Sequence, residues 1–552
     1  MISSLRFWFL LGLIVLVYLA GMFVTLFEND SAQFAVMAMR MVQEQNFLNL
    51  FKGAEEYLDK PHMHYWLAAL SFKIFGIHDW AYRIPGILAT LLAAYSAYGL
   101  GKLLYNVQTG RLAALIFMTA QTIVLGAIDV RTDAVLTGFA IFSIWQLASY
   151  VKTGSVKAIV LGAFGAGMAF STKGQIALVV IGFSLLCHIG YIRKWKVFFS
   201  WKVLVALLVF LLTITPMLYA YYHQFDLHPE KIIRGRTDRS GIFFIFWEQS
   251  FERMSGEGIG KNSSDYFFFF HTFLWVFLPW TVLGILAIRK RIMAFVRLRF
   301  QYRPNHEFLT LGGIALIFVT ISFAQFKLPH YLNVTIPLFA VLTASFLNQV
   351  QAYGDTARIK LFLGIQYVVL GLFFVVCCLL CFFVFDVEEV WLFALLGILL
   401  LSIVYLVIKQ GTPFAKLISL TVFASLLLNA VLNLHFYPQL LNYQAGSSMA
   451  KVVERENISV DKIYKIGEGH TWALDFYNQH PVKSTTLASA LGKKDVWLYL
   501  SEQQMETLRD TGTDWNRQYA VDQFRITRLS AKFLNPQTRY KVLNKTYLVH
   551  LY

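Results

Sequence analysis

Apolar runs of about 20 residues recur along the whole chain, and they restrict its fold more than any other feature. A run of this length spans the hydrocarbon core of a bilayer as one α-helix. About thirteen such runs can be counted, at 7–27, 81–101, 111–128, 134–151, 157–172, 175–192, 203–222, 266–288, 308–325, 332–349, 361–385, 390–408 and 414–436. Only 14% of the residues are charged, whereas a soluble domain has roughly 25%. The chain is therefore predicted to be a polytopic α-helical membrane protein.

The basic residues give this predicted bundle an orientation. The formal net charge is +16, which in a soluble protein would suggest nucleic acid as a partner. Here most lysines and arginines fall in the short loops that follow every second span, such as 193–202 and 289–303. Cytoplasmic loops carry such an excess of positive charge. We therefore expect a cytoplasmic N-terminus and attribute the charge to membrane topology, with no nucleic acid partner.

Two loops on the opposite, outer face are long. The first, 28–80, contains two stretches in which apolar residues recur at helical spacing, 32–43 and 62–75. Such amphipathic stretches can lie flat at the membrane surface. The second long loop is 223–265.

The C-terminal tail changes composition abruptly and is predicted to form a small α/β domain. Its predicted elements are strands at 496–500, 541–543 and 547–550, with a turn at 544–545, and a helix at 502–509. We therefore predict two domains, a membrane domain over 1–437 and an outer α/β domain over 438–552.

Three carboxylates fall near the membrane surface, where burying a charge is costly and needs a reason. Asp30 follows the first span directly, and Asp129 and Asp133 flank Arg131 between the third and fourth spans. All of them lie on the outer face in the predicted topology. Asp30 could also be a helix cap before Ser31, so the local sequence leaves a structural and a chemical role open.

Basic residues share the outer face with these acids. Lys60 precedes Pro61 at a predicted helix start, where a phosphate could bind, although a lysine reaching toward lipid headgroups would look the same. Arg253 lies in the second long loop, and Lys327 lies at the end of the ninth span. Together, the acids and cations predict an outward-facing cleft that accepts a phosphate group.

Two other kinds of site are not indicated by the sequence. The glycine-rich stretch 256–260 lacks the Lys-Ser/Thr ending and the preceding strand of a nucleotide-binding loop, which argues against ATP or a soluble sugar nucleotide. The four cysteines all lie within apolar runs, so no disulfide framework is expected.

Short motifs follow Asp30 in a specific order. They are Asp59-Lys60-Pro61, His64-Tyr65-Trp66-Leu67, Arg83-Ile84-Pro85, Arg131-Thr132-Asp133-Ala134-Val135-Leu136, Ser171-Thr172-Lys173-Gly174, Leu278-Pro279-Trp280 and Lys327-Leu328-Pro329-His330-Tyr331. In this order they resemble the bacterial arm of the protein O-mannosyltransferase superfamily of GT-C glycosyltransferases, and within it the aminoarabinose–lipid A transferases. The resemblance spans roughly residues 1–440 and implies a GT-C fold with juxtamembrane helices on the periplasmic side.

The resemblance also implies a reaction. Enzymes of this superfamily move a sugar from a polyprenyl phosphate, such as undecaprenyl phosphate, to an acceptor hydroxyl, generally with inversion. The chain would then lie in the bacterial inner membrane, with its active site and C-terminal domain in the periplasm. Lipid A, another envelope glycolipid and an exported protein all stay open as acceptors.

Residue by residue, the resemblance implies a composite site. Asp30 matches the catalytic acid of the family, which we expect to act as a general base toward the acceptor hydroxyl, and Asp133 matches a second acidic position. The predicted site comprises Asp30 and Asp133 as catalytic residues, Lys60, Arg253, Tyr331 and Lys327 around the donor phosphate, and Tyr57, Asp59, Arg131 and Glu248 along the cavity.

The sequence departs from the aminoarabinose branch at several of these positions. After the catalytic Asp, Ser31, Gln33 and Phe34 stand where that branch usually has Glu, Arg and Tyr, and Asp59 stands where it has Glu. Glu248 stands where that branch has a His that helps to hold a metal. The identity of the sugar and the presence of a divalent metal therefore stay open.

Two other classes of function compete with this prediction. A transporter or flippase for a lipid-linked sugar would use Asp30 and Asp133 as substrate carboxylates, but such sites lie near mid-membrane and often come with inverted repeats. A scaffold that binds a partner through its outer domain would not explain the cluster of acids and cations. We therefore favour the glycosyltransferase.

Overall fold

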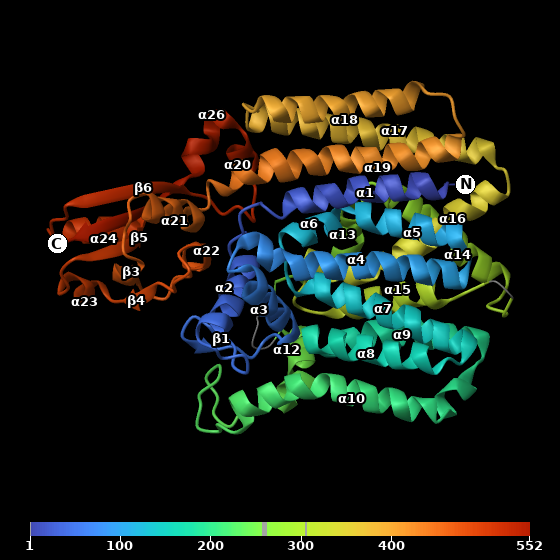
Figure 1. The fold of residues 1–552 in the computed structure, drawn as a ribbon, viewed down its shortest axis with the longest axis horizontal. Coiled ribbons are helices and arrows are strands. Elements are labelled where there is room, and N and C mark those ends of the chain that lie inside the picture. Colours follow the sequence, from blue (N-terminus) through green and yellow to red (C-terminus); the bar gives the residue numbers. More distant parts are fainter. Residues whose placement is uncertain (1, 257–261, 304–305) are drawn as a thin grey trace.

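The computed structural model describes residues 2–256, 262–303 and 306–552, so most of the glycine-rich stretch 256–260 lies outside the described residues. In the described parts, long helices run side by side in a bundle, and a small sheet domain extends from one end of it (Figure 1). The N-terminus lies at the opposite end of the bundle. This architecture confirms the predicted helical membrane protein with a small C-terminal α/β domain.

Nine helices among the described residues are long and apolar enough to cross a membrane, and ten spans result if one bent pair counts as a single span. The bent pair consists of α5 (Val107–Thr119) and α6 (Gln121–Ile128), which meet at 55°. The nine helices are α1 (Ser4–Gly21), α4 (Asp79–Leu104), α7 (Thr132–Thr153), α9 (Gln175–Ile192), α10 (Lys202–Tyr221), α16 (Ile336–Ala352), α17 (Thr356–Leu379), α18 (Val390–Ile408) and α19 (Pro413–Val431). Short π or 3-10 turns extend four of them: η2 (Tyr222–Asp226), η4 (Pro329–Thr335), η5 (Leu380–Val384) and η6 (Leu432–Phe436).

The prediction of about thirteen spans exceeds this count because three apolar runs form helices that are short, broken or flanked by charge. α8 (Val156–Lys173) has a lysine in its first turn and another in its last. Another run breaks at Pro279 into α13 (Phe268–Val276) and α14 (Thr281–Arg297), since proline lacks the N–H that a continuous helix needs. α15 (Leu309–Phe323) has 15 residues, fewer than a full span requires.

Small residues allow two of the spans, α4 and α7, to approach closely. A Cβ atom on Gly138 would lie 2.6 Å from the carbonyl oxygen of Ala89. Gly138→Ala is therefore expected to force the spans apart and to lower the melting temperature in detergent, by an overpacking cost of about 1–3 kcal/mol. Gly182→Ala in α9 is the matched control, because nothing lies within 4 Å of its Cβ position. Equal losses in the two variants would contradict this account of the packing.

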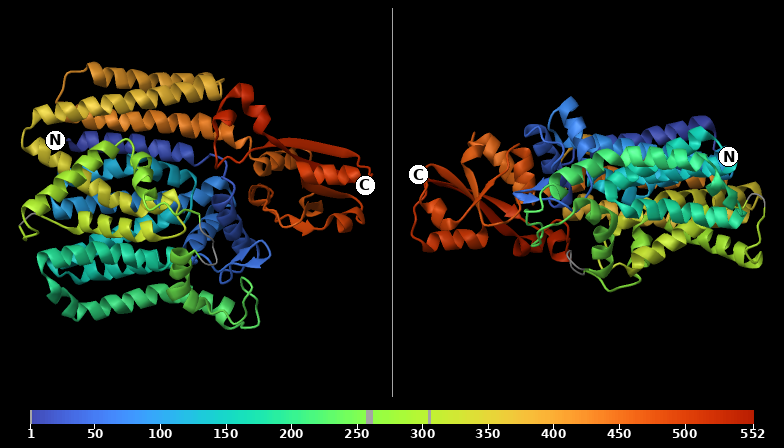
Figure 2. Two further views of the ribbon diagram at one scale, coloured as in Figure 1. Left: turned by 180° about the vertical axis from the view of Figure 1, so that it is seen from behind. Right: turned by 90° about the horizontal axis from the view of Figure 1, so that it is seen from below.

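Two helices lie at the end of the bundle that carries the sheet domain (Figures 1 and 2). α2 (Asp30–Gln43) and α3 (Met63–Phe75) confirm the two predicted amphipathic stretches as helices. α2 is buried along most of its length, because it packs against both α3 and α22 (Trp472–Tyr477) of the C-terminal domain. The short strands β1 (Phe51–Lys52) and β2 (Glu55–Glu56) form a hairpin between the two helices.

Beyond η2, the described part of the second long loop contains three short helical segments. They are α11 (Gly241–Phe243), η3 (Phe244–Glu248) and α12 (Gln249–Ser255). α12 reaches back to the first loop, because the side-chain amide of Gln249 donates to the carbonyl of Asp59 over 2.6 Å. The two long loops therefore meet. A separate turn, η1 (Trp195–Phe199), connects α9 and α10.

The C-terminal domain is built on a five-stranded mixed sheet of order β4-β3-β5-β7-β6. β3 pairs in parallel with β4 and β5, whereas β7 pairs antiparallel with β5 and β6. The strands are β3 (Ile463–Ile466), β4 (Lys483–Thr485), β5 (Val496–Ser501), β6 (Arg517–Gln523) and β7 (Asn544–Leu551). The helical segments from residue 437 onward are α20 (Tyr437–Leu441), α21 (Ala445–Arg455), η7 (Val460–Lys462), α22, α23 (Leu487–Leu491), α24 (Glu502–Asp510), α25 (Ala531–Leu534), α26 (Pro536–Arg539) and η8 (Tyr540–Val542).

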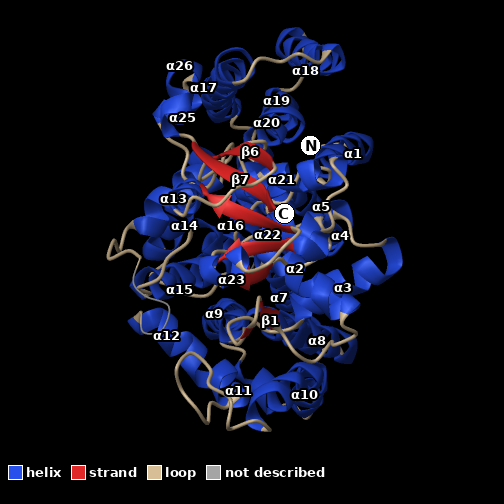
Figure 3. Cartoon of the chain, turned by 90° about the vertical axis from the view of Figure 1, so that its left-hand side faces the viewer, coloured by secondary structure: helices blue, strands red, loops and turns tan. Residues whose placement is uncertain are grey.

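All five predicted elements of this domain can be compared directly with the structure, and the strand predicted at 547–550 is confirmed as part of β7. β5 and α24 confirm the predicted strand and helix near residues 496–509. The predicted strand at 541–543 and the turn at 544–545 are wrong. β7 runs straight through Asn544 and Lys545, because both residues pair with β6. Seen from its own end of the molecule, the sheet lies in front of the helical bundle (Figure 3).

Candidate active site

A polar cavity of about 150 Å³ lies where the start of α2, the loop before α3, the start of α7, α12 and η4 come together. Its lining residues are Asp30, Phe34, Tyr57, Asp59, Lys60, Arg131, Thr132, Asp133, Lys173, Arg253, Phe326, Leu328, His330 and Tyr331. The structure thus brings together the predicted site residues from both long loops and from two helix starts, with Lys327 and Glu248 as the exceptions. Residues as far apart in the sequence as Asp30 and Tyr331 meet in this cavity.

Asp30 is the first residue of α2, and its side chain is 40% exposed. Its carboxylate accepts a hydrogen bond from Arg131 over 2.7 Å, and the same guanidinium pairs with Asp129 over 2.9 Å. Burial disfavours the charge on Arg131, but Asp129 and Asp30 outweigh it and raise the pKa of the guanidinium above its usual value. Arg131 therefore stays charged and holds one carboxylate oxygen of Asp30. The Asp30 side chain lines the cavity.

Asp133 occupies the first turn of α7 and is buried. The Lys173 ammonium at the end of α8 donates to its carboxylate over 2.6 Å. His330, from η4, lies 3.7 Å from the other oxygen of Asp133 and 3.4 Å from the guanidinium of Arg131. The negative charge of Asp133 is thus balanced by the Lys173 ammonium. Asp30 is the more accessible of the two acids.

Two of the predicted phosphate-binding residues, Lys60 and Arg253, converge on Asp59. Its carboxylate lies 2.9 Å from the Lys60 ammonium and 3.0 Å from the Arg253 guanidinium, and Arg234 approaches within 3.7 Å. Arg253 also donates to the phenol oxygen of Tyr331 over 2.8 Å. Lys60, Arg253 and Tyr331 therefore present two cations and a hydroxyl to one small volume, which is the donor set that a phosphate monoester or diester needs.

The charges in this cluster perturb one another. Burial disfavours the ionised form of Asp59, but Lys60 and Arg253 outweigh it and hold the pKa of that carboxyl well below its usual range. Burial and repulsion from Arg253 lower the pKa of Lys60 to about 8, although Asp59 partly opposes them. The cluster thus carries more positive than negative charge near neutral pH, and it attracts an anion.

An apolar groove of about 280 Å³ continues from the polar cavity and shares with it the three cations Lys60, Lys173 and Arg253 and the carboxylate of Asp133. Aliphatic and aromatic side chains from α9, α12, α15 and the segment after α15 line the groove: Ile176, Val179, Phe251, Met254, Ile317, Ile321, Ala324 and Phe326. The groove has an apolar wall and a cationic end, which fits a lipid chain with a phosphate headgroup.

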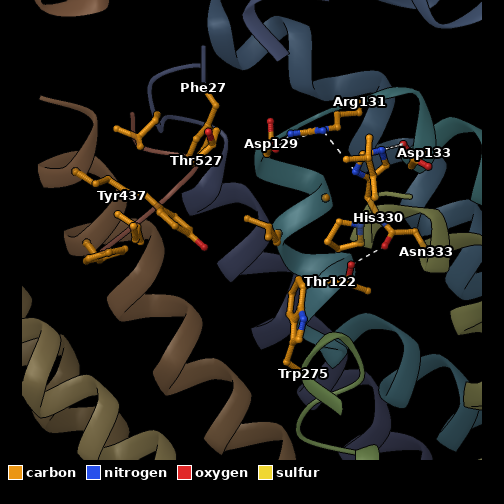
Figure 4. Close-up of a pocket in the computed structure, with 18 residues that line it drawn as sticks. Phe27, Thr122, Asp129, Arg131, Asp133, Trp275, His330, Asn333, Tyr437 and Thr527 are labelled. Carbon is orange, nitrogen blue, oxygen red and sulfur yellow. Dashed lines mark hydrogen bonds and ion pairs between the residues drawn. The ribbon is translucent and has the colours of Figure 1, made fainter. Parts of the chain in front are cut away.

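A second cavity of about 410 Å³ adjoins the polar cavity, and its lining is shown in Figure 4. Arg131, Asp133 and His330 line both, so the two cavities meet at this network. Across the second cavity lie Phe27 and Tyr437. Further wall residues are Leu125, Trp275, Phe436, Leu440, Ile526, Thr527 and Leu529, the last three from the C-terminal domain.

Two predicted site residues lie elsewhere. The Lys327 ammonium donates to the carbonyl of Ser263 and lies over the ring of Tyr266, while its neighbours Phe326 and Leu328 line the polar cavity. Lys327 thus points away from the cavity that its two neighbours line, and its ammonium is not placed at the predicted donor phosphate site. Glu248 pairs with Arg239 over 3.0 Å in the second long loop and does not line the polar cavity.

Lys173 and His330 belong to the site, although the sequence prediction did not include them. Lys173 lines both the polar cavity and the apolar groove, and His330 lines both the polar and the second cavity. Each lies in a short motif that carried the family resemblance, Ser171–Gly174 for the lysine and Lys327–Tyr331 for the histidine. Their place in these motifs could have identified them from the sequence. The residue types alone do not, because a lysine or a histidine at such a position does not by itself indicate a site.

The described residues contain no group of three or more His, Cys, Asp or Glu side chains arranged to hold a metal ion. Glu248, which the family comparison placed at a metal-ligand position, has an arginine as its partner.

Comparisons with known proteins agree with this geometry. Residues 59–219 match the family of dolichyl-phosphate-mannose-protein mannosyltransferases. The undecaprenyl phosphate-α-4-amino-4-deoxy-L-arabinose arabinosyl transferases of Edwardsiella ictaluri and Proteus mirabilis are each 25% identical, over 367 and 362 residues. These matches cover 63% and 62% of this chain, but only 61% and 60% of the two enzymes. The chain thus spans about three fifths of the length of these curated relatives.

The similarity in fold to known structures extends over nearly the whole chain. The crystal structures of ArnT from Cupriavidus metallidurans, in the apo state and bound to undecaprenyl phosphate, superpose with TM-scores of 0.74 and 0.73. Both superpositions cover 99% of this chain and 98% of the other, at 16% and 15% sequence identity. The resemblance is therefore confirmed: this chain has the GT-C fold and is similar in sequence to the aminoarabinose branch of the protein O-mannosyltransferase superfamily.

Proposed function

We propose that this chain is an inverting glycosyltransferase that moves a sugar from undecaprenyl phosphate, or a related polyprenyl phosphate, to a hydroxyl of an acceptor. One observation carries the proposal: an apolar groove leads into a cationic cavity that contains Asp30 and Asp133, and that cavity meets a second cavity at Arg131, Asp133 and His330. A lipid-linked sugar would therefore enter through the groove, and an acceptor would enter through the second cavity.

The donor would bind with its prenyl chain in the apolar groove and its phosphate among Lys60, Arg253 and Tyr331. The transferred sugar would then project toward Asp30. As the bond between the anomeric carbon and the phosphate oxygen breaks, negative charge develops on the phosphate. The two cations and the phenol are placed to stabilise that charge, which is the largest single contribution in many enzymes. No proton has to be delivered to this leaving group.

Asp30 would act as the general base. The acceptor hydroxyl gives its proton to the Asp30 carboxylate, its oxygen attacks the anomeric carbon, and the lipid phosphate leaves on the opposite face, so the configuration inverts. Arg131 orients the carboxylate through one oxygen. An aspartate is a weak base, so close positioning of the reacting groups has to supply much of the rate. Asp133 and Lys173 would form the polar floor of the sugar site.

The lining of the second cavity favours a lipid acceptor over a peptide. One end is polar, with Arg131, Asp133 and His330, and the opposite wall is formed by Phe27, Tyr437 and other apolar side chains. An amphiphile such as lipid A or another envelope glycolipid would place its sugar at the polar end and its acyl chains along the apolar wall. An exported protein would leave most of that wall uncovered.

The orientation follows from the basic loops. The multi-pass bundle would lie in the bacterial inner membrane with its N-terminus in the cytoplasm. The helices α2 and α12, which contribute to the lining of the polar cavity, lie at the end of the bundle that carries the sheet domain, and the N-terminus lies at the other end. The active site and the C-terminal domain would then face the periplasm, where lipid-linked sugars and envelope glycolipids meet.

The proposal is tested by incubating purified protein with radiolabelled undecaprenyl phosphate-4-amino-4-deoxy-L-arabinose and lipid A, and by following transfer of the label. Appearance of labelled lipid A, with release of undecaprenyl phosphate, is the expected result. A flippase would instead move the labelled donor across proteoliposomes without breaking the sugar–phosphate bond. Translocation without transfer, for this and other polyprenyl-linked sugars, would overturn the enzymatic proposal.

The lowered pKa of Lys60 predicts a pH dependence. Below pH 8 the ammonium is charged and attracts the donor phosphate, and the charge is lost as the pH rises through about 8. Because kcat/KM reports the free enzyme, it is expected to fall as the pH rises above 8. Lys60→Arg keeps the cation at these pH values, so this alkaline fall should disappear whatever the activity of the variant. The same fall in both proteins would show that another group titrates.

A further inference from the structure

The segment between α1 and α2 carries Asp30 into the cavity, and its own structure is irregular. Residues 22–29 form neither a helix nor a strand. Asn29, directly before Asp30, has a φ of 66°, a left-handed conformation that costs energy for a residue with a side chain. Local backbone hydrogen bonds join Val24 to Gly21 and Ala32 to Phe27, and contacts from outside the segment hold the residues between them. The position of Asp30 therefore depends in part on these outside contacts.

On the bundle side, Arg83 holds the segment. Its guanidinium is fully buried and donates to the carbonyls of Met22 and Thr25 over 2.9 and 3.2 Å. It also donates to the carbonyl of Ile128 over 2.9 Å, one residue before Asp129. Arg83 therefore connects the segment before Asp30 to the segment that contains Asp129 and Arg131.

On the opposite side, the C-terminal domain holds the same segment. The backbone N–H of Leu26 donates to the Tyr477 phenol over 2.8 Å, and the Leu26 carbonyl accepts from the Gln444 amide over 2.9 Å. The N–H of Glu28 donates to the Gln444 side-chain oxygen over 2.7 Å. The partly buried carboxylate of Glu28 accepts from the N–H of Ala473 over 3.2 Å. These contacts end two residues before Asp30.

We propose that the C-terminal domain is a positioning element of the active site, in which Gln444 and Tyr477 hold residues 26–28 and thereby set the reach of the Asp30 carboxylate. This inference rests on the proposed function, because it assigns the domain a part in the same reaction. Loss of these contacts is expected to lower the catalytic rate, because a displacement of about 1 Å of a reacting group can cost on the order of 100-fold in rate.

A second observation agrees with this role. Ile526, Thr527 and Leu529, in the segment between β6 and α25, form part of the wall of the second cavity. The C-terminal domain therefore contacts the site twice, once at the segment that carries the base and once at the proposed acceptor cavity. The donor phosphate residues lie on other elements, so loss of these contacts should leave donor binding intact.

The test compares Gln444→Ala with Gln479→Ala. Both side chains belong to the C-terminal domain and both touch the rest of the protein, but Gln479 donates to the carbonyl of Ile77, away from the Asp30 segment. Gln444→Ala is expected to lower kcat for transfer from undecaprenyl phosphate-4-amino-4-deoxy-L-arabinose at least 10-fold, with an unchanged donor KM and unchanged binding of undecaprenyl phosphate. Gln479→Ala should behave as the wild type.

Two further variants keep the test decisive. Gln444→Glu retains the acceptor for the Glu28 N–H but loses the donor to Leu26, so an intermediate kcat is expected. Tyr477→Phe removes only the hydroxyl and should lower kcat if Gln444→Ala cannot be purified. Similar behaviour of the Gln444 and Gln479 variants, or a loss confined to KM, would overturn the positioning role. A wild-type protein without any transfer would instead contradict the proposed function itself.

Discussion

Replacing Asp30 with asparagine is expected to lower sugar transfer by about 100- to 10,000-fold, the range of general-base contributions. Asparagine has nearly the same shape and can still accept a hydrogen bond from Arg131, but it cannot take a proton from the acceptor hydroxyl. Binding of undecaprenyl phosphate should stay near the wild-type level, because Lys60, Arg253 and Tyr331 are untouched. Transfer of label and a binding assay on the same preparation measure the two effects.

Asp129→Asn is the matched comparison for this variant. Asp129 pairs with the same Arg131 guanidinium as Asp30, so its neutralisation disturbs the arginine while leaving the proposed base in place. We expect a clearly smaller loss of transfer from it. If Asp30→Asn retains substantial activity, or if the two variants lose the same amount, Asp30 is not the base.

Replacing Arg253 with methionine should have the second largest effect. The change removes the guanidinium that contacts both Asp59 and Tyr331, and it keeps the apolar stem along the groove. Loss of one group that stabilises developing charge typically costs about 100- to 1,000-fold in rate. Here the ground-state phosphate is also bound, so weaker donor binding should accompany the lower kcat. Steady-state kinetics with varied donor concentration separate these two contributions.

Arg234→Met supplies the control for this prediction. Arg234 lies 3.7 Å from Asp59 and pairs with Glu252, and it is absent from the residues that line the polar cavity. A small change in kcat/KM is expected, since the variant removes a nearby positive charge without removing a phosphate ligand. Equal effects of the two arginine variants would mean that net charge, and not contact with the phosphate, determines activity.

The sequence by itself determined the class of fold, because each span needs a long apolar run and each such run is visible along the chain. It also located the acids and most of the cations at the ends of these runs, and it identified the helices α2 and α3 from their apolar spacing. Residues such as Lys60 and Arg253 could be assigned to one site only through the ordered motifs of the family, since nothing local connects them.

Only the tertiary structure decided which side chains meet. Lys327 and Arg253 carry the same charge on the same face, but backbone direction turns Lys327 toward Ser263 and Arg253 toward Tyr331. The hydrogen bond from the Ala473 N–H to the Glu28 carboxylate joins residues 445 positions apart, and no sequence pattern in either segment predicts it. Sequence patterns record local propensity and burial, whereas the direction of a side chain and its distant partners depend on how the completed elements pack. For that reason the sequence revealed the kinds of groups in the site, and packing alone revealed that the C-terminal domain holds the segment carrying Asp30.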